Sequence, residues 1–198
     1  FGEHRDLFAE LQSGQSPKTL LIGCSDSRVD PALLTDCNPG DLFVVRNVAN
    51  LVPPYEVDGA FHGVSSAIEY AVVHLQVSKI IILGHSGCGG IQALMQESEP
   101  KTEANFIGRW VRIADAAREQ VQRELAHKSL DRQIRACEMA AIIVSLDNLM
   151  SFPFIAERVQ SGQLILIGWY FDILRGALYD FDQERNSFQA LVTSLKTD

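Results

Sequence analysis

The chain has 198 residues, of which 25 are acidic and 17 basic, and its formal net charge is -8. This charge would repel a phosphate backbone, so nucleic acid is not an expected partner. No apolar run approaches the roughly 20 residues that span a bilayer, so we expect no membrane segment. The length fits a single domain over residues 1–198, and we expect it to be cytoplasmic, or to lie in an organelle or microcompartment if a targeting segment precedes it.

Hydrophobic periodicity predicts strands that alternate with helices along the chain. In chain order, the expected helices cover residues 6–12, 30–35, 62–77, 91–96, 106–125, 130–149 and 151–162. The expected strands begin at Thr19 and then cover residues 42–46, 80–83, 163–171 and 177–181. This alternation predicts an α/β fold, with a mostly parallel central sheet of about four strands, an antiparallel edge strand at 177–181, and flanking helices.

The strand that begins at Thr19 ends in chemically active side chains. Cys24, Asp26 and Arg28 follow its apolar run at every second position. In an extended segment, side chains two apart point the same way, so a thiol, a carboxylate and a guanidinium would share one face. Because open α/β sheets carry their chemistry at the carboxyl ends of strands, this pattern predicts a site and not a core.

The expected strand at residues 80–83 ends similarly, with His85 and Cys88 just beyond it. Together with Cys24 they form a set of three soft or borderline ligands, which suits tetrahedral zinc. Three protein ligands leave one position open, the pattern of a catalytic zinc site. The sequence therefore predicts Zn²⁺ as the cofactor, held by Cys24, His85 and Cys88 in reducing surroundings.

Two roles are open to Asp26 beside such a metal. As a fourth ligand it would close the site, whereas paired with Arg28 it would accept a hydrogen bond from a water on the metal. A bidentate pair would hold the carboxylate away from the metal, so we favour the second role. Two thiolates leave the zinc site formally neutral, and we therefore expect an alkaline activity optimum.

At these residues the sequence resembles the β-class carbonic anhydrases, and among them the plant-like type. The resemblance runs from about Gln15 to about Asp182, and its motifs are CSDSR at 24–28, GDLFVVRN at 40–47 followed by Ala49 and Asn50, and GHSxCGG at 84–90. It implies reversible hydration of CO2 to bicarbonate and a proton through a zinc-bound hydroxide. Cys24, His85 and Cys88 would bind zinc, and Asp26 with Arg28 would form a catalytic dyad.

The same resemblance implies a substrate pocket made of Gln15, the apolar walls Phe43, Val48 and Tyr70, and the backbone N–H of Gly89. It also implies that the pocket is completed in a homodimer or larger even homo-oligomer, and that the N-terminal helical arm is truncated in this chain. Plain burial explains the aromatic side chains equally well, so their role stays open.

Two other functions remain open at this stage. A carbonyl sulfide or carbon disulfide hydrolase would use the same metal chemistry. A non-catalytic, zinc-stabilised or redox-sensing domain would have Asp26 as a closing fourth ligand. Chelator-sensitive turnover separates an enzyme from a structural zinc domain.

Overall fold

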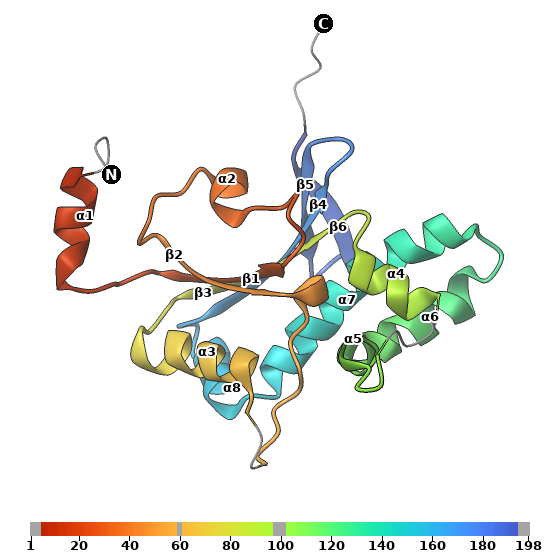
Figure 1. Cartoon of the computed structure of the whole chain (residues 1–198), viewed down its shortest axis with the longest axis horizontal. Coiled ribbons are helices and arrows are strands. Elements are labelled where there is room, and N and C mark those ends of the chain that lie inside the picture. The colour runs from red at the N-terminus through yellow and green to blue at the C-terminus, as the bar shows by residue number, and fades with distance from the viewer. Residues whose placement is uncertain (1–4, 59–60, 97–101, 194–198) are drawn as a thin grey trace, which may run out of the picture.

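The computed structural model describes residues 5–58, 61–96 and 102–193, and its centre is a six-stranded sheet of order β2-β1-β3-β4-β5-β6 (Figure 1). The strands are β1 (Thr19–Cys24), β2 (Leu42–Asn47), β3 (Lys79–His85), β4 (Ile165–Asp172), β5 (Ala177–Asp182) and β6 (Ser187–Val192). Strands β1, β2, β3 and β4 are parallel to one another. Strand β5 pairs with β4 in the antiparallel direction, and β6 pairs with β5 in the antiparallel direction. The predicted α/β class and the predicted strand directions are therefore confirmed, but the strand expected as the edge, β5, is covered by β6, which forms that edge of the sheet.

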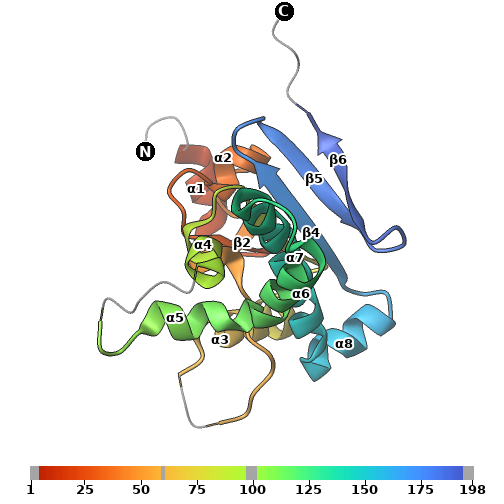
Figure 2. The same ribbon diagram turned by 90° about the vertical axis from the view of Figure 1, so that its right-hand side faces the viewer.

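The helices are α1 (Arg5–Glu10), α2 (Pro31–Thr35), α3 (Gly63–Glu69), α4 (Gly89–Met95), α5 (Phe106–Val111), α6 (Asp115–Leu125), α7 (Leu130–Met150) and α8 (Pro153–Gln160). Helices α3, α7 and α8 lie on one face of the sheet and α2 lies on the other (Figure 1). Helices α4, α5 and α6 gather beyond one end of the sheet in Figure 1, on the side that faces the viewer in Figure 2. None of the helices in the described ranges is by itself long and apolar enough to cross a bilayer, although α7 and α8 together, bent by 94°, reach that length and composition.

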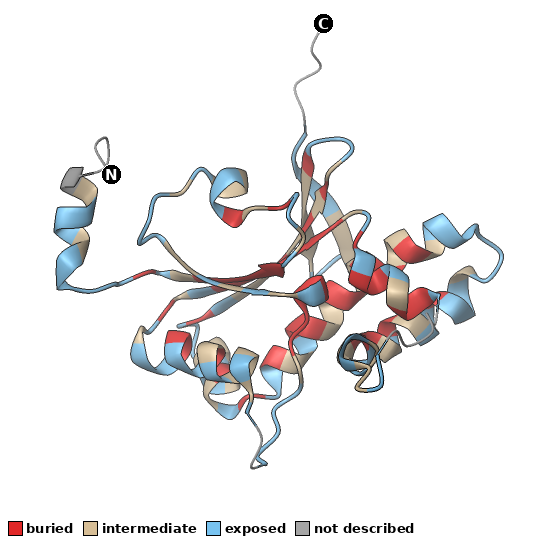
Figure 3. Ribbon diagram, in the orientation of Figure 1, coloured by how far each residue is buried: buried red, intermediate tan, exposed pale blue. Residues whose placement is uncertain are grey.

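Alternation along the central strands decides which helices they meet. Leu20 and Ile22 of β1 face the core beneath α3, α7 and α8, whereas Leu21 between them faces the α2 side. All three side chains are fully buried, as expected for a strand covered on both faces. Buried residues accordingly concentrate in the central strands and along α7 (Figure 3).

Two expectations about individual elements were wrong. The helix expected over residues 106–125 is α5 and α6, separated by the 3-10 turn η4 (Arg112–Ala114). Val111 and Ala114 are both buried at this break, so the tighter turn keeps the apolar side of the chain against the core. Strand β6 was not expected, because most of its side chains are half-buried or exposed and its sequence lacks a strong period. Phe188 anchors it, with its ring 5.2 Å from that of Phe181.

The topology brings two carboxyl ends of strands together. Strands β1 and β3 are neighbours and parallel, with Gly23 paired to Leu83. Cys24 and His85 therefore emerge at the same edge of the sheet, as the sequence predicts.

Candidate metal centre

Three buried side chains converge where β1 and β3 end. The ligand atoms of Cys24, His85 and Cys88 all lie within 4.8 Å of one another, and the two Sγ atoms are 3.9 Å apart. Two thiolates on one tetrahedral zinc at about 2.3 Å would be separated by roughly 3.8 Å, so the sulfur spacing fits the ion.

The histidine ring is oriented for metal binding. His85 Nδ1 lies 3.0 Å from the carbonyl oxygen of Ser86, and in the tautomer in which Nδ1 donates, Nε2 presents its lone pair to the sulfurs. Nε2 is buried and has no hydrogen-bond partner among the residues that the structure describes. Because a buried polar atom ordinarily has a partner, this orphaned nitrogen indicates a ligand position. The donor set of one nitrogen and two sulfurs fits zinc.

The two thiols behave as one acidic pair. The hydrogen bond with Cys88 holds the pKa of the Cys24 thiol well below its usual range, against the effect of burial, and His85 assists. The same hydrogen bond, with burial, raises the pKa of Cys88. One proton shared between two sulfurs leaves a negative charge in the site, and a divalent cation would displace that proton.

A tight turn delivers the last two ligands. His85 ends β3, Gly87 adopts a left-handed conformation with φ +68°, and Cys88 immediately precedes α4. Ser86 fixes the turn to the end of β4, since its N–H donates to Phe171 O over 2.9 Å. Its hydroxyl oxygen accepts the N–H of Ile173, also at 2.9 Å.

Asp26 and Arg28 form the pair that their spacing suggests. Arg28 Nε lies 2.9 Å from Asp26 Oδ1, and Arg28 Nη2 lies 2.7 Å from Oδ2. The N–H of Arg28 also donates to Oδ1, at 3.0 Å. These hydrogen bonds hold the pKa of Asp26 well below its usual range. Asp26 Oδ2 stands 3.9 Å from His85 Nε2, so the carboxylate lies beside the ligand cluster while both of its oxygens are bound to arginine.

The proposed pocket residues fall into two groups. Gly89 is the first residue of α4, directly after Cys88. Val48 lies in the 3-10 turn η2 (Val48–Asn50), against the same helix, because a Cβ added to Gly90 would meet Val48 Cγ1 at 2.7 Å. These two residues therefore lie beside the metal centre.

The other three candidates lie at the opposite end of the strands. Phe43 pairs with Leu20, four residues before Cys24, which places it about 13 Å back along the sheet. Its ring is 5.8 Å from that of Tyr70, and exposed Gln15 precedes β1. Within one chain, the structure does not bring these side chains to the zinc ligands.

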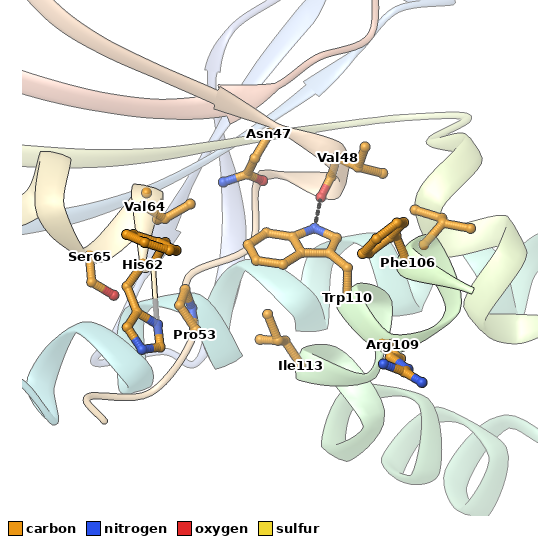
Figure 4. Close-up of a pocket in the computed structure, with 13 residues that line it drawn as sticks. Asn47, Val48, Pro53, His62, Val64, Ser65, Phe106, Arg109, Trp110 and Ile113 are labelled. Atoms are coloured by element: carbon orange, nitrogen blue, oxygen red, sulfur yellow. Dashed lines mark hydrogen bonds between the residues drawn. The ribbon is translucent and has the colours of Figure 1, made fainter. Parts of the chain in front are cut away.

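An apolar cavity of about 760 Å³ opens beside Val48 (Figure 4). The indole N–H of Trp110 donates to Val48 O over 2.7 Å and fixes one wall. Phe61, Phe106 and Ile113 contribute further apolar lining, and none of the three zinc ligands lines the cavity.

Fold and site together define a zinc enzyme of the α/β class, with ligands at adjacent strand ends. The carbonic anhydrase family model matches residues 19–178. A carbonic anhydrase of Synechocystis sp. (strain ATCC 27184 / PCC 6803 / Kazusa) is 38% identical over 190 residues, which are 96% of this chain and 69% of that protein. The solved β-carbonic anhydrase CcaA is 38% identical with a TM-score of 0.90, covering 96% of this chain and 91% of its own.

A tetrameric β-carbonic anhydrase from Sordaria macrospora is 28% identical with a TM-score of 0.76, covering 98% of this chain and 90% of its own. The chain belongs to the β class of the carbonic anhydrase family. Its reaction is the reversible hydration of CO2, and the predictions of a zinc cofactor and a lyase activity are confirmed.

Proposed function

We propose that this carbonic anhydrase is of the plant-like type, in which no protein side chain takes the fourth position on the metal. The observation that carries the proposal is the doubly hydrogen-bonded Asp26–Arg28 pair. To ligate a metal, Asp26 would have to give up contacts to a guanidinium that also donates to Gly87 O over 2.9 Å. A charge-assisted bidentate pair of this kind resists such a rotation.

The side chains then have defined tasks. When bound, zinc supplies Lewis-acid chemistry that makes a water nucleophilic near neutral pH. Asp26, kept ionised by Arg28, accepts a hydrogen bond from the attacking water and orients its lone pair toward CO2. The N–H of Gly89 is placed to donate to a substrate oxygen, and Val48 shields the apolar substrate from bulk water.

Stopped-flow CO2 hydration with a pH indicator, on zinc-loaded protein at one neutral and one alkaline pH, tests this proposal. We expect turnover at both values, rising toward alkaline pH. Activity at alkaline pH alone would instead make Asp26 a removable fourth ligand. No activity at either pH, in protein shown to contain zinc, would contradict the proposed type and favour carbonyl sulfide or carbon disulfide as the substrate.

We also propose that a second copy of the chain completes the pocket, in a homodimer or larger even assembly. Phe43 and Tyr70 lie too far from the zinc ligands of their own chain to contact a substrate there, and Tyr70 is 45% exposed. The apolar cavity beside Val48 offers a surface for the partner, and α1 extends away from its own sheet (Figure 1). The tetrameric Sordaria relative supports self-association of this fold.

Complementation between two inactive variants tests this arrangement. Cys24→Ser removes a ligand from its own centre, and Tyr70→Ala removes a wall from the centre of its partner. If the walls come from the partner, a mixed dimer regains one intact site, so mixing and reassembly restores up to a quarter of the activity. Sedimentation shows whether dimers form. A dimer that regains no activity on mixing would contradict the shared pocket.

A further inference from the structure

A buried carboxylate lies directly behind the metal centre. Glu138 of α7 is 3% exposed, and its Oε1 accepts the backbone N–H of Cys88 at 2.9 Å. Its Oε2 accepts the hydroxyl of Tyr170 at 2.8 Å, and Tyr170 is fully buried in β4. Both carboxylate oxygens are therefore committed, one to the metal-ligand turn and the other to the sheet.

The turn that Glu138 contacts has little stiffness of its own. Cys88 is flanked by Gly87 on one side and by Gly89 and Gly90 on the other, and glycine restricts the backbone least. Ser86 is fixed to β4 by the two hydrogen bonds described above, and Arg28 holds the carbonyl of Gly87. For the amide of Cys88, the corresponding support comes from α7 through Glu138.

Tyr170 is itself firmly placed. The guanidinium of Arg135 lies 5.6 Å from the centroid of its ring, and Phe188 packs edge-on against it at 6.2 Å. Arg135 is in turn bonded to Asp172 over 2.7 Å. The carboxylate of Glu138, which accepts the N–H of Cys88, is therefore held by both α7 and β4.

We propose that Glu138 is a positioning residue for the zinc site: supported by Tyr170, it fixes the amide of Cys88 so that this thiol converges with Cys24 and His85. Groups that orient metal ligands typically change metal affinity 10- to 100-fold when removed. The role depends on an acceptor at a fixed distance, so it predicts different effects for substitutions of different shape.

Four variants separate the effects of shape and charge. Glu138→Gln keeps the length and an acceptor for Cys88, whereas Glu138→Asp keeps the charge but withdraws the acceptor by one methylene. Glu138→Ala removes the acceptor, and Tyr170→Phe removes its support. Ile155→Val serves as a control for general destabilisation, because Ile155 of α8 is fully buried in the core away from the site.

Zinc affinity is measured by competition with a chromophoric chelator, and ligand geometry by the thiolate charge-transfer and d–d bands of the Co²⁺-substituted proteins. We expect zinc binding weakened about 10- to 100-fold in Glu138→Ala and Glu138→Asp, with altered cobalt bands. Glu138→Gln and Ile155→Val should stay near the wild-type protein, and Tyr170→Phe should be intermediate.

Three results would overturn the proposal. Wild-type affinity and cobalt bands in Glu138→Asp would show that acceptor distance is irrelevant, and this comparison holds even if Glu138→Ala does not fold. Weaker zinc binding in Glu138→Gln than in Glu138→Asp would assign the effect to the charge of Glu138 and not to the position of its acceptor. An equal loss of zinc affinity in Ile155→Val would show that general destabilisation, and not the position of Cys88, causes the effect. None of these readouts depends on turnover, so they are separate from the test of the plant-like type.

Discussion

Arg46 on β2 donates from Nε to the carbonyl oxygen of Cys24 on β1 over 3.0 Å. Its Nη2 also donates to the carbonyl oxygens of Asp26, at 2.7 Å, and Val29, at 3.0 Å. One side chain therefore fixes three points of the segment that carries Cys24 and Asp26. Hydrogen bonds to a charged donor are stronger than neutral ones, so this side chain is a main support of the segment.

Arg46→Met tests the importance of these contacts. We expect the free energy of unfolding of the zinc-loaded protein to fall by about 2 to 4 kcal/mol, because three carbonyl oxygens lose a charged donor. Denaturant unfolding measures the change, with Arg185→Met, at an exposed surface pair, as the matched control. A loss no larger than that of the control would show that the segment holds its shape without Arg46.

Arg28→Lys keeps a positive charge beside Asp26 but cannot form the two parallel hydrogen bonds. We expect the kcat for CO2 hydration to fall about 100-fold near neutral pH, with less loss at alkaline pH, because the freed carboxylate competes for the metal. Zinc content measured on the same samples is expected to be unchanged. Wild-type rates at both pH values would make the bidentate pair dispensable.

Gly89 and Gly90 offer a matched pair of substitutions in α4. A Cβ on Gly90 would lie 2.7 Å from Val48 Cγ1 and 3.0 Å from Ala49 Cβ, whereas one on Gly89 meets nothing within 4 Å. We expect Gly90→Ala to lower the free energy of unfolding by about 1 to 3 kcal/mol, and to lower kcat/KM by displacing Val48. Gly89→Ala retains its backbone N–H, and we expect little change in activity and up to about 1 kcal/mol of added stability. Thermal unfolding and stopped-flow assays compare the two, and equal behaviour would contradict the prediction.

The carboxylate of Asp172 makes the free energy of unfolding depend on pH in the acidic range. Burial alone would raise its pKa, but hydrogen bonds from Arg175 and Arg135 prevail and lower it from an ordinary value of 3.8 to about 2. The folded state therefore favours the ionised carboxylate, which contributes on the order of 2 kcal/mol above pH 4. This contribution disappears as the pH falls from about 4 to about 2, where Asp172 becomes protonated in the folded state too.

Asp172→Asn removes this titration. We expect the variant to be less stable than the wild-type protein near neutral pH, with the difference shrinking between pH 4 and pH 2. Urea midpoints measured across that range check this expectation. Asp131→Asn, at an exposed position in the first turn of α7, is the control and is expected to track the wild-type curve. A constant deficit for Asp172→Asn at all pH values would refute the link to this carboxylate.

The metal centre was predictable because its geometry follows from local rules. The every-second-residue spacing of Cys24 and Asp26 in an extended segment, and the parallel alignment of β1 with β3, suffice to bring the ligands to one edge. The role of Glu138 could not be predicted from the sequence, because its partner Cys88 is 50 positions away. The other buried positions of its helix are mostly apolar, so nothing in the pattern marks this one as polar and buried. The separation of Phe43 from Cys24 along the sheet depends on strand register, which only the assembled structure defines.

The two sulfurs of the centre are 64 positions apart in the chain. A metal ion that joins them acts as a cross-link that closes a long loop, and such a link restricts the unfolded chain as a disulfide does. Cys24 ends β1, and Cys88 follows β3 after a three-residue step through His85, so an ion bound by both sulfurs would hold the carboxyl ends of these two central strands together. Removal of the ion should therefore ease local opening at this end of β1 and β3, which amide hydrogen exchange would detect.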